Sequence, residues 1–285
     1  LRGKVGFTLE TREKKRGDRF DGYWLRDEVP AMNQFMGYLL PNRADNEAFI
    51  RQEIDLRPMD AFLAKKNAGL EKDKYSYFHV ILAACVKCFV LRPRMNRFIS
   101  GNRIYQRDHI SVAFVVKKRF EDSSSEGLAY KRYTGDDTID TLHASILEEI
   151  YQCRRTDVED NSNAFMQKLM RLPSWLLRIV VKILFKLDRK GKVPYDIIRT
   201  DPNYASIFLT NLGSIGLDAG YHHLNNWGTN SFFGVIGKKH LAPEWHEDGS
   251  CTVHPVLDLG LTLDERIGDG FYYSGTVRLL RKLLE

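Results

Sequence analysis

The chain has 285 residues, of which 43% are hydrophobic, 12% aromatic and 28% charged. This composition is typical of a folded globular protein with a sizeable core, and it excludes an intrinsically disordered chain. The net charge of +6 is scattered along the sequence and no nucleic-acid-binding motif accompanies it, so we expect no nucleic-acid partner.

Cysteine usage and hydropathy point to a reducing compartment. Cys85 and Cys88 form a C-x-x-C within an apolar stretch, where two thiols on one helical face are expected to pack as small apolar groups. No second cysteine pair or suitably spaced histidine pair completes a zinc site, so we expect no metal. The sequence has no signal-peptide pattern and no run of about 18 uncharged apolar residues. We therefore expect a cytoplasmic protein with reduced thiols.

The N-terminal segment, residues 1–50, differs in character from the rest of the chain. It is rich in Arg, Asp, Gly and Pro and lacks regular periodicity, but it carries aromatic residues such as Trp24 and Phe35. We interpret it as an arm that packs on the core or on a neighbouring subunit. Residues 51–285 are expected to form one further unit, since no repeat or clear linker divides them.

Strands and helices are mixed from residue 53 onward. Hydrophobic periodicity predicts a strand at 53–56, helices at 59–66 and 75–91, strands at 103–105, 109–116 and 128–133, an amphipathic helix at 140–154, strands at 205–209 and 231–236, and a hairpin over 245–263. This order predicts the α/β class, as a two-layer α+β sandwich with helices packed on a sheet.

The most informative motif is D-E-R-I-G-D-G at residues 264–270. It follows an alternating apolar run at 257–263 and precedes a helix-like stretch that ends at Leu284. Strand, polar turn, Asp-Gly and helix is the layout of D-H-R-x-x-D-G, an acyltransferase signature. The segment resembles the catalytic domain of 2-oxoacid dehydrogenase acyltransferases and, more distantly, chloramphenicol acetyltransferase. This resemblance implies a chloramphenicol acetyltransferase-like mixed sheet flanked by helices, assembled as a homotrimer with active sites at subunit interfaces.

A second segment, F-L-T-N-L-G-S-I-G at residues 208–216, carries the same resemblance. In the family this is a strand end whose Ser or Thr hydroxyl donates a hydrogen bond to the oxyanion of the tetrahedral intermediate. Thr210 stands at that position. The chemistry requires a fixed donor about 3 Å from the developing charge, and a strand end supplies the rigidity. The plainer alternative is that Thr210 is a β-branched strand residue without a catalytic role.

Glu265 stands where the family has its histidine base, which takes a proton from the CoA thiol or from the acceptor. Histidine suits this task because its ordinary pKa is near 6.5. Glutamate is ordinarily a weaker base by about two pKa units, although burial of a carboxyl group can restore much of that difference. Two interpretations stay open: Glu265 is a working acid or base, or it marks altered or lost catalysis.

Two further residues of the motif have roles by resemblance. Asp269 matches the signature aspartate, which pairs with an arginine to hold the active-site turn, and Arg266 matches the signature arginine. We expect Asp269 and Arg266 to hold this turn together. Both could persist for folding alone, because removing one partner of a buried ion pair is costly.

The histidine pair His222 and His223 offers another base. The alternative is a pair of loop histidines whose nitrogens are satisfied by the backbone. Neighbours in sequence rarely converge on one ion, so this pair alone does not predict a metal site.

The chain departs from the family in a helical insertion at about 160–195. Within it, residues 172–187 are largely apolar, and Arg178, Lys182 and Lys186 form one cationic stripe four residues apart. Such a helix can lie at a membrane surface, cap an acyl channel, pack against another subunit, or lie between core and solvent.

The resemblance implies a CoA-dependent acyltransferase that moves an acyl group between CoA and an unidentified small-molecule nucleophile. Coenzyme A enters as the acyl-CoA substrate, and we expect neither a metal nor a lipoyl group on this chain. The alternative is a catalytically degenerate relative that acts as a binding or scaffold trimer. A third interpretation is a membrane-surface acyltransferase anchored through residues 172–187.

Overall fold

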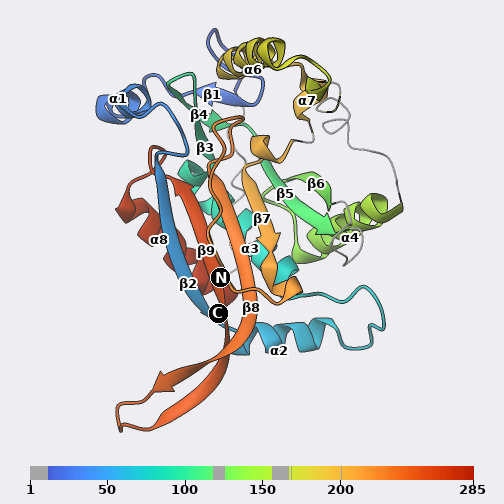
Figure 1. Cartoon of the computed structure of the whole chain (residues 1–285). Helices are drawn as coiled ribbons and strands as arrows, with labels where there is room; N and C mark the ends of the chain where they lie inside the picture. The colour runs from blue at the N-terminus through green and yellow to red at the C-terminus, as the bar shows by residue number, and fades with distance from the viewer. Residues whose placement is uncertain (1–11, 118–125, 156–166, 168, 200) are drawn as a thin grey trace.

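A six-stranded mixed sheet forms the centre of the molecule (Figure 1). The structure, a computed structural model, describes residues 12–117, 126–155, 167, 169–199 and 201–285. In spatial order the strands are β2 (Glu47–Asp55), β9 (Cys251–Asp264), β8 (Phe232–Trp245), β7 (Ile207–Asn211), β5 (Ile110–Lys117) and β6 (Glu126–Tyr133). β7 runs parallel to both its neighbours, whereas the remaining pairs are antiparallel. The predicted mixed sheet is therefore confirmed.

A small second sheet and several helices complete the described fold. The small sheet has the order β1 (Gly22–Trp24), β4 (Arg103–Arg107) and β3 (Arg97–Ser100). The α-helices are α1 (Ala31–Leu39), α2 (Arg57–Lys66), α3 (Tyr77–Leu91), α4 (Ile139–Arg155), α6 (Ser174–Arg189), α7 (Tyr195–Ile198) and α8 (Gly270–Leu284). Short 3₁₀ turns lie at Pro93–Asn96, Pro202–Tyr204 and Leu212–Ile215. Among the described helices, none has the length and apolar character needed to cross a membrane.

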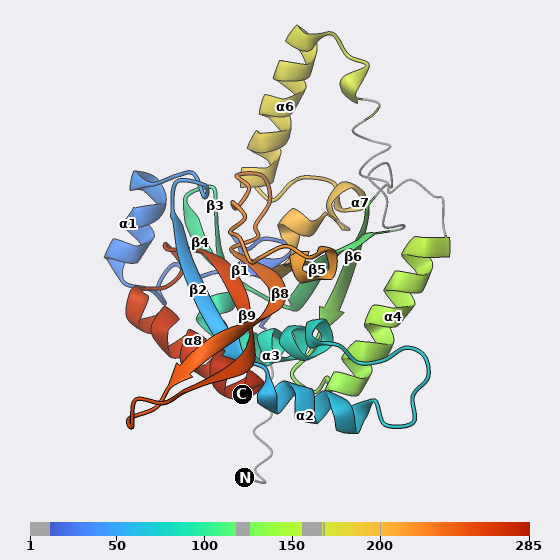
Figure 2. The ribbon, with the colours of Figure 1, turned by 60° about the horizontal axis from the view of Figure 1, so that its bottom comes forward.

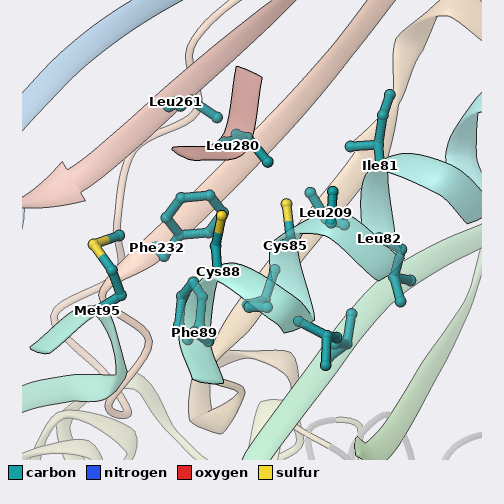
Figure 3. Close-up of a cluster of buried hydrophobic side chains, with 14 of the residues drawn as sticks. Ile81, Leu82, Cys85, Cys88, Phe89, Met95, Leu209, Phe232, Leu261 and Leu280 are labelled. Carbon is teal, nitrogen blue, oxygen red and sulfur yellow. The ribbon is translucent and has the colours of Figure 1, made fainter. Parts of the chain in front are cut away.

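Helix α3 forms the centre of the hydrophobic core. Figures 1 and 2 show α3, α4 and α8 on one face of the large sheet. In Figure 3, side chains of α3 such as Cys85 and Phe89 lie against Leu209, Phe232 and Leu261 from three strands. Cys88 also lies in this core, and burial raises the pKa of its thiol to about 12. The two thiols therefore pack as neutral apolar groups, as the sequence predicted.

The opposite face of the sheet is covered by the segment 212–230. Phe208, Phe233, Val235 and Leu224 form a separate small cluster there. The backbone of this segment comes very close to β9, because a Cβ added at Gly260 would lie 2.0 Å from the carbonyl oxygen of Gly220. Glycine at position 260 is what permits this approach.

The N-terminal segment contains more regular structure than its sequence predicted. Residues 1–11 lie outside the described part, but β1, α1 and the first residues of β2 all fall within 12–50, which was expected to be irregular. β2 starts at Glu47, which pairs with Asp264, so its extent depends on a strand far away in sequence. The insertion expected at about 160–195 contains α6 and the start of α7; residues 160–166 and 168 lie outside the described part.

Because the backbone comes so close to Gly260, alanine at position 260 should destabilise the protein more than alanine at position 220. We expect Gly260→Ala to lower the free energy of unfolding by about 2 kcal/mol, because the new methyl group meets backbone that must shift. Gly220→Ala is the matched control, since its Cβ would meet nothing within 4 Å. Denaturant unfolding of both variants measures the difference, and equal losses would contradict the contact.

His79 gives α3 a pH-dependent cap. Its Nδ1 accepts a hydrogen bond from the backbone N–H of Ser76, at 3.0 Å, at the start of the helix. Burial, with a smaller effect of His143, lowers the pKa of His79 to about 4. Below pH 6.5, His79 therefore binds a proton in the unfolded state but stays neutral in the folded state. The free energy of unfolding thus falls as the pH drops below 6.5.

We expect the wild-type protein to lose about 2 kcal/mol of unfolding free energy from this group between pH 7 and pH 5. His79→Gln keeps an acceptor at the same capping position but does not titrate in this range, so it should show a smaller loss. Denaturant unfolding at both pH values is the measurement. The same pH dependence in both proteins would show that His79 is not responsible.

Candidate active site

The motif at residues 264–270 forms the turn between β9 and α8. Asp269 is the N-cap of α8, and its Oδ1 accepts a hydrogen bond from the backbone N–H of Tyr272, at 2.8 Å. Tyr273 donates from its hydroxyl to the carbonyl oxygen of Asp264, at 2.6 Å. The turn is thus fixed at both ends, by a helix cap and by a buried tyrosine.

Asp264, and not Asp269, is the partner of Arg266. Two nitrogens of the Arg266 guanidinium donate to the two carboxylate oxygens of Asp264, at 2.8 and 2.6 Å, and both side chains are buried. Asp269 and Arg266, both expected to hold the turn, contact it separately, because the Asp269 carboxylate caps α8 while Arg266 pairs with Asp264. A third buried group, Arg43, places its Nε 3.6 Å from Asp264. One carboxylate thus lies between two buried guanidinium groups.

Glu265 lies at a groove between the edge strand β2 and helix α8. Its backbone N–H donates to the carbonyl oxygen of Asn46, at 2.9 Å, whereas its side chain is exposed and has no hydrogen-bond partner among the described residues. The groove has a volume of about 650 Å³. Its walls include Ala48, Ile50 and Val277, with Arg278 as a cation. The main chain of the turn is therefore fixed while the carboxylate stays free to meet a ligand or a second chain.

Thr210 lies far from Glu265 within one chain. Thr210 pairs with Val235, and Val235 pairs with Gly260, which precedes Glu265 by five residues. Two strand spacings amount to about 10 Å and five residues of strand to about 17 Å, so the separation is roughly 20 Å. These two residues therefore cannot act on the same bond unless they come from different chains.

His222 lies on the same face of the sheet as Thr210. Its ring stacks on Phe233, with ring centres 4.3 Å apart and planes within 7°. Phe233 pairs with Phe208, which lies two residues before Thr210 on the same face, so Phe233 and Thr210 are about 8 Å apart. His222 and His223 are both exposed and stack on each other. The sequence identified the histidines, but only the packing of the loop reveals their proximity to Thr210.

The described residues contain no cluster of three or more His, Cys, Asp or Glu side chains that could hold a metal ion. The candidate polar groups lie in two places: the hydroxyl of Thr210 and the imidazoles of His222 and His223 on one face of the sheet, and the carboxylate of Glu265 at the groove. These groups suit proton transfer and hydrogen bonding to an oxyanion.

The buried pair at the turn predicts a large effect of charge removal. We expect Asp264→Asn to lower the free energy of unfolding by about 3 kcal/mol or more, because Arg266 and Arg43 would keep buried charges without their carboxylate. Denaturant unfolding monitors the loss.

Asp258→Asn serves as the control, because it makes the same chemical change six residues earlier on the same strand, β9. Asp258 pairs with Arg51, whose side chain is 63% exposed, so its loss should cost below about 1 kcal/mol. Similar losses of unfolding free energy in the two variants would show that burial does not make the Asp264–Arg266 pair more important for stability.

Comparisons with known proteins show which fold this chain has. No protein-family model matches the chain, and no curated protein matches it. Among solved structures, a probable dihydrolipoamide acetyltransferase from Listeria monocytogenes has a TM-score of 0.58 and 14% identity, over 90% of this chain and 94% of that one. The dihydrolipoamide acetyltransferase of Azotobacter vinelandii has a TM-score of 0.57 and 18% identity, over 90% of each chain.

A chloramphenicol acetyltransferase is also similar, with a TM-score of 0.53 and 15% identity, over 93% of this chain and 100% of that one. The identities are low, but the matches extend over almost the whole of each chain. The chain therefore has the fold shared by dihydrolipoamide acetyltransferases and chloramphenicol acetyltransferase.

Proposed function

We propose that the protein is a CoA-dependent acyltransferase that moves an acyl group between CoA and a small-molecule nucleophile. The observation that carries this proposal is the position of Glu265 in a chain of acetyltransferase fold. Its carboxylate stands at the groove between β2 and α8, on a turn that the buried Asp264–Arg266 pair fixes. A fixed backbone with a free acid or base group is the arrangement that proton transfer requires.

The groove fits the thiol-bearing arm of CoA better than its phosphates. Ala48, Ile50 and Val277 give it apolar walls, and Arg278 is the cation that lines it. Glu265 and Asp269 also line the groove and would repel a phosphate. In this proposal the uncharged arm of CoA lies in the groove and presents its thiol to Glu265.

The active form in this proposal is a homotrimer, as the family resemblance implies. The separation of roughly 20 Å between Thr210 and Glu265 supports two contributing chains. Thr210 of one chain would stabilise the oxyanion, while Glu265 of the next would hold or accept the proton. Arg266 would act only through the turn, by its pairing with Asp264. Asp269 would act through the turn as well, by capping α8.

Thiol release from a panel of short acyl-CoAs tests these roles. With water as the nucleophile that takes the acyl group, we expect slow thiol release by the wild type and loss with Glu265→Gln. We expect a reduction of about 100-fold with Thr210→Ala, because removing one oxyanion donor has an effect of that size. His222→Gln distinguishes the two candidate bases, with His223→Gln as its matched control. Sedimentation of each variant shows whether the assembly is intact.

Each outcome bears on a different part of the proposal. Loss of turnover with His222→Gln, but not with Glu265→Gln, would identify the His222 imidazole as the base. The proposal of an acyltransferase would then stand with a different base. Unchanged turnover in Thr210→Ala would remove the assigned oxyanion role. If the wild type releases no thiol from any acyl-CoA, the result would count against catalysis.

The second candidate function is a binding or scaffold trimer that has lost catalysis. The observation that favours it is the absence of any described hydrogen-bond partner that would orient the Glu265 carboxylate. It predicts that wild type is silent and that Glu265→His gains thiol release, since the imidazole would restore the family base. Weak or absent CoA binding by calorimetry would strengthen this candidate.

A further inference from the structure

A second cavity, which Glu265 does not line, lies between helix α6 and the strands β3 and β4 with the turn that joins them. Its volume is about 830 Å³. Gly101 of this turn and Arg103 and Tyr105 of β4 line it, together with residues from 17–19 and from 181–192. None of the residues assigned above to proton transfer or to the oxyanion lines it. Its lining residues from 181 to 192 lie within the insertion expected at about 160–195.

The walls of this cavity are strongly basic. Six cationic side chains line it without forming an ion pair to any described residue: Arg103, Lys182, Lys186, Arg189, Lys190 and Lys192. The dipole of α6 is equivalent to about half a negative charge at its C-terminus and so offsets only part of this charge. A concave surface lined by one sign of charge concentrates counter-ions.

The other two charged residues of the cavity wall are already paired. Asp18 is the acidic residue of the cavity wall. Its carboxylate binds Arg12 at 2.6 Å and accepts hydrogen bonds from the backbone N–H groups of Lys15 and Trp24. Arg19 binds Asp21 at 2.9 Å. Neither residue neutralises the six cations, so the cavity keeps a large positive charge.

The cationic wall is anchored firmly to the rest of the molecule. The carboxylate of Asp188, near the end of α6, accepts hydrogen bonds from the hydroxyl of Tyr204, at 2.6 Å, and from the backbone N–H of Gly228, at 3.1 Å. Arg19 donates to the carbonyl oxygen of Asp188, at 2.6 Å. Lys186 and Lys190 lie within two residues of this anchor, so the backbone that carries them is held in place.

The rest of α6 stands out from the body of the protein (Figure 2). Trp175, Ile179 and Ile183 expose between 47% and 66% of their surface there. Val181 and Phe185 line the cavity itself, beside Tyr105. A ligand that fits these surroundings carries negative charge at one end and apolar surface next to it.

We propose that this basic cavity is a binding site for a phosphate-bearing group. Phosphate matches the charge and the several nitrogen donors of lysine and arginine side chains. The group could belong to a free phosphorylated molecule or to the headgroup of an anionic lipid. The inference does not depend on the acyltransferase proposal.

Two binding measurements on the full chain distinguish the two sources. Calorimetric titration with pyrophosphate tests a free ligand, and co-sedimentation with phosphatidylcholine vesicles, with or without phosphatidylglycerol, tests a headgroup. We expect binding in at least one measurement, and we expect it to weaken as salt is added. Binding only to vesicles with phosphatidylglycerol would identify the lipid headgroup as the source, and pyrophosphate binding would identify a free ligand.

A double variant, Lys186→Gln with Lys190→Gln, tests whether the cavity is the site. Its affinity should fall at least about tenfold, the factor expected for one lost charge-assisted hydrogen bond. Lys65→Gln with Lys72→Gln removes the same charge from exposed positions far from the cavity and should bind as wild type does. All four positions are exposed, so folding is expected to survive, and thermal unfolding checks it.

Two outcomes would overturn the proposal. One is no binding in either measurement. The other is equal weakening in both double variants, which would show that total charge and not this cavity attracts the anion.

Discussion

A single buried carboxylate, that of Asp264, determines how the end of the sheet is built. It pairs with Arg266 on its own turn and lies 3.6 Å from Arg43, and all three side chains are buried. Arg43 also donates to three backbone carbonyls on two other segments. Because buried charges without partners are costly, each of these contacts depends on that carboxylate. The position of Glu265, the next residue, follows from this arrangement.

The two faces of the large sheet are covered in different ways. The helix face is a continuous hydrophobic core centred on α3. The other face is covered by a single irregular segment, which lies against the strands where glycine leaves room, as at Gly260. Thr210 and His222 belong to this second face, whereas Glu265 belongs to the turn at the edge of the sheet. The candidate chemistry is therefore divided between two places in one chain, which is why the proposed activity involves two chains.

Elements whose own residues carry a pattern were predicted well from the sequence. The alternating leucines of 257–263 indicated β9, and the continuous apolar stretch around Cys85 indicated the central helix α3. β2 was predicted only in part, because its first residues are defined by pairing with β9. The partner of Arg266 could not be read from the sequence, since Asp264 and Asp269 flank it almost equally. The backbone path of the turn decides between them, by directing Asp269 to the end of α8.

The pairing of β2 with β9 also has a consequence for how the protein is made. β9 lies between β2 and β8 in the sheet, yet it follows β2 by about 200 residues in the chain. At about 5 to 20 residues per second, a ribosome needs roughly 10 to 40 seconds to cover that distance. Throughout this interval β2 has been synthesised but lacks its partner, with Phe49 and Ile50 in an unpaired strand. An unpaired strand of this kind is open to pairing with other chains until β9 emerges.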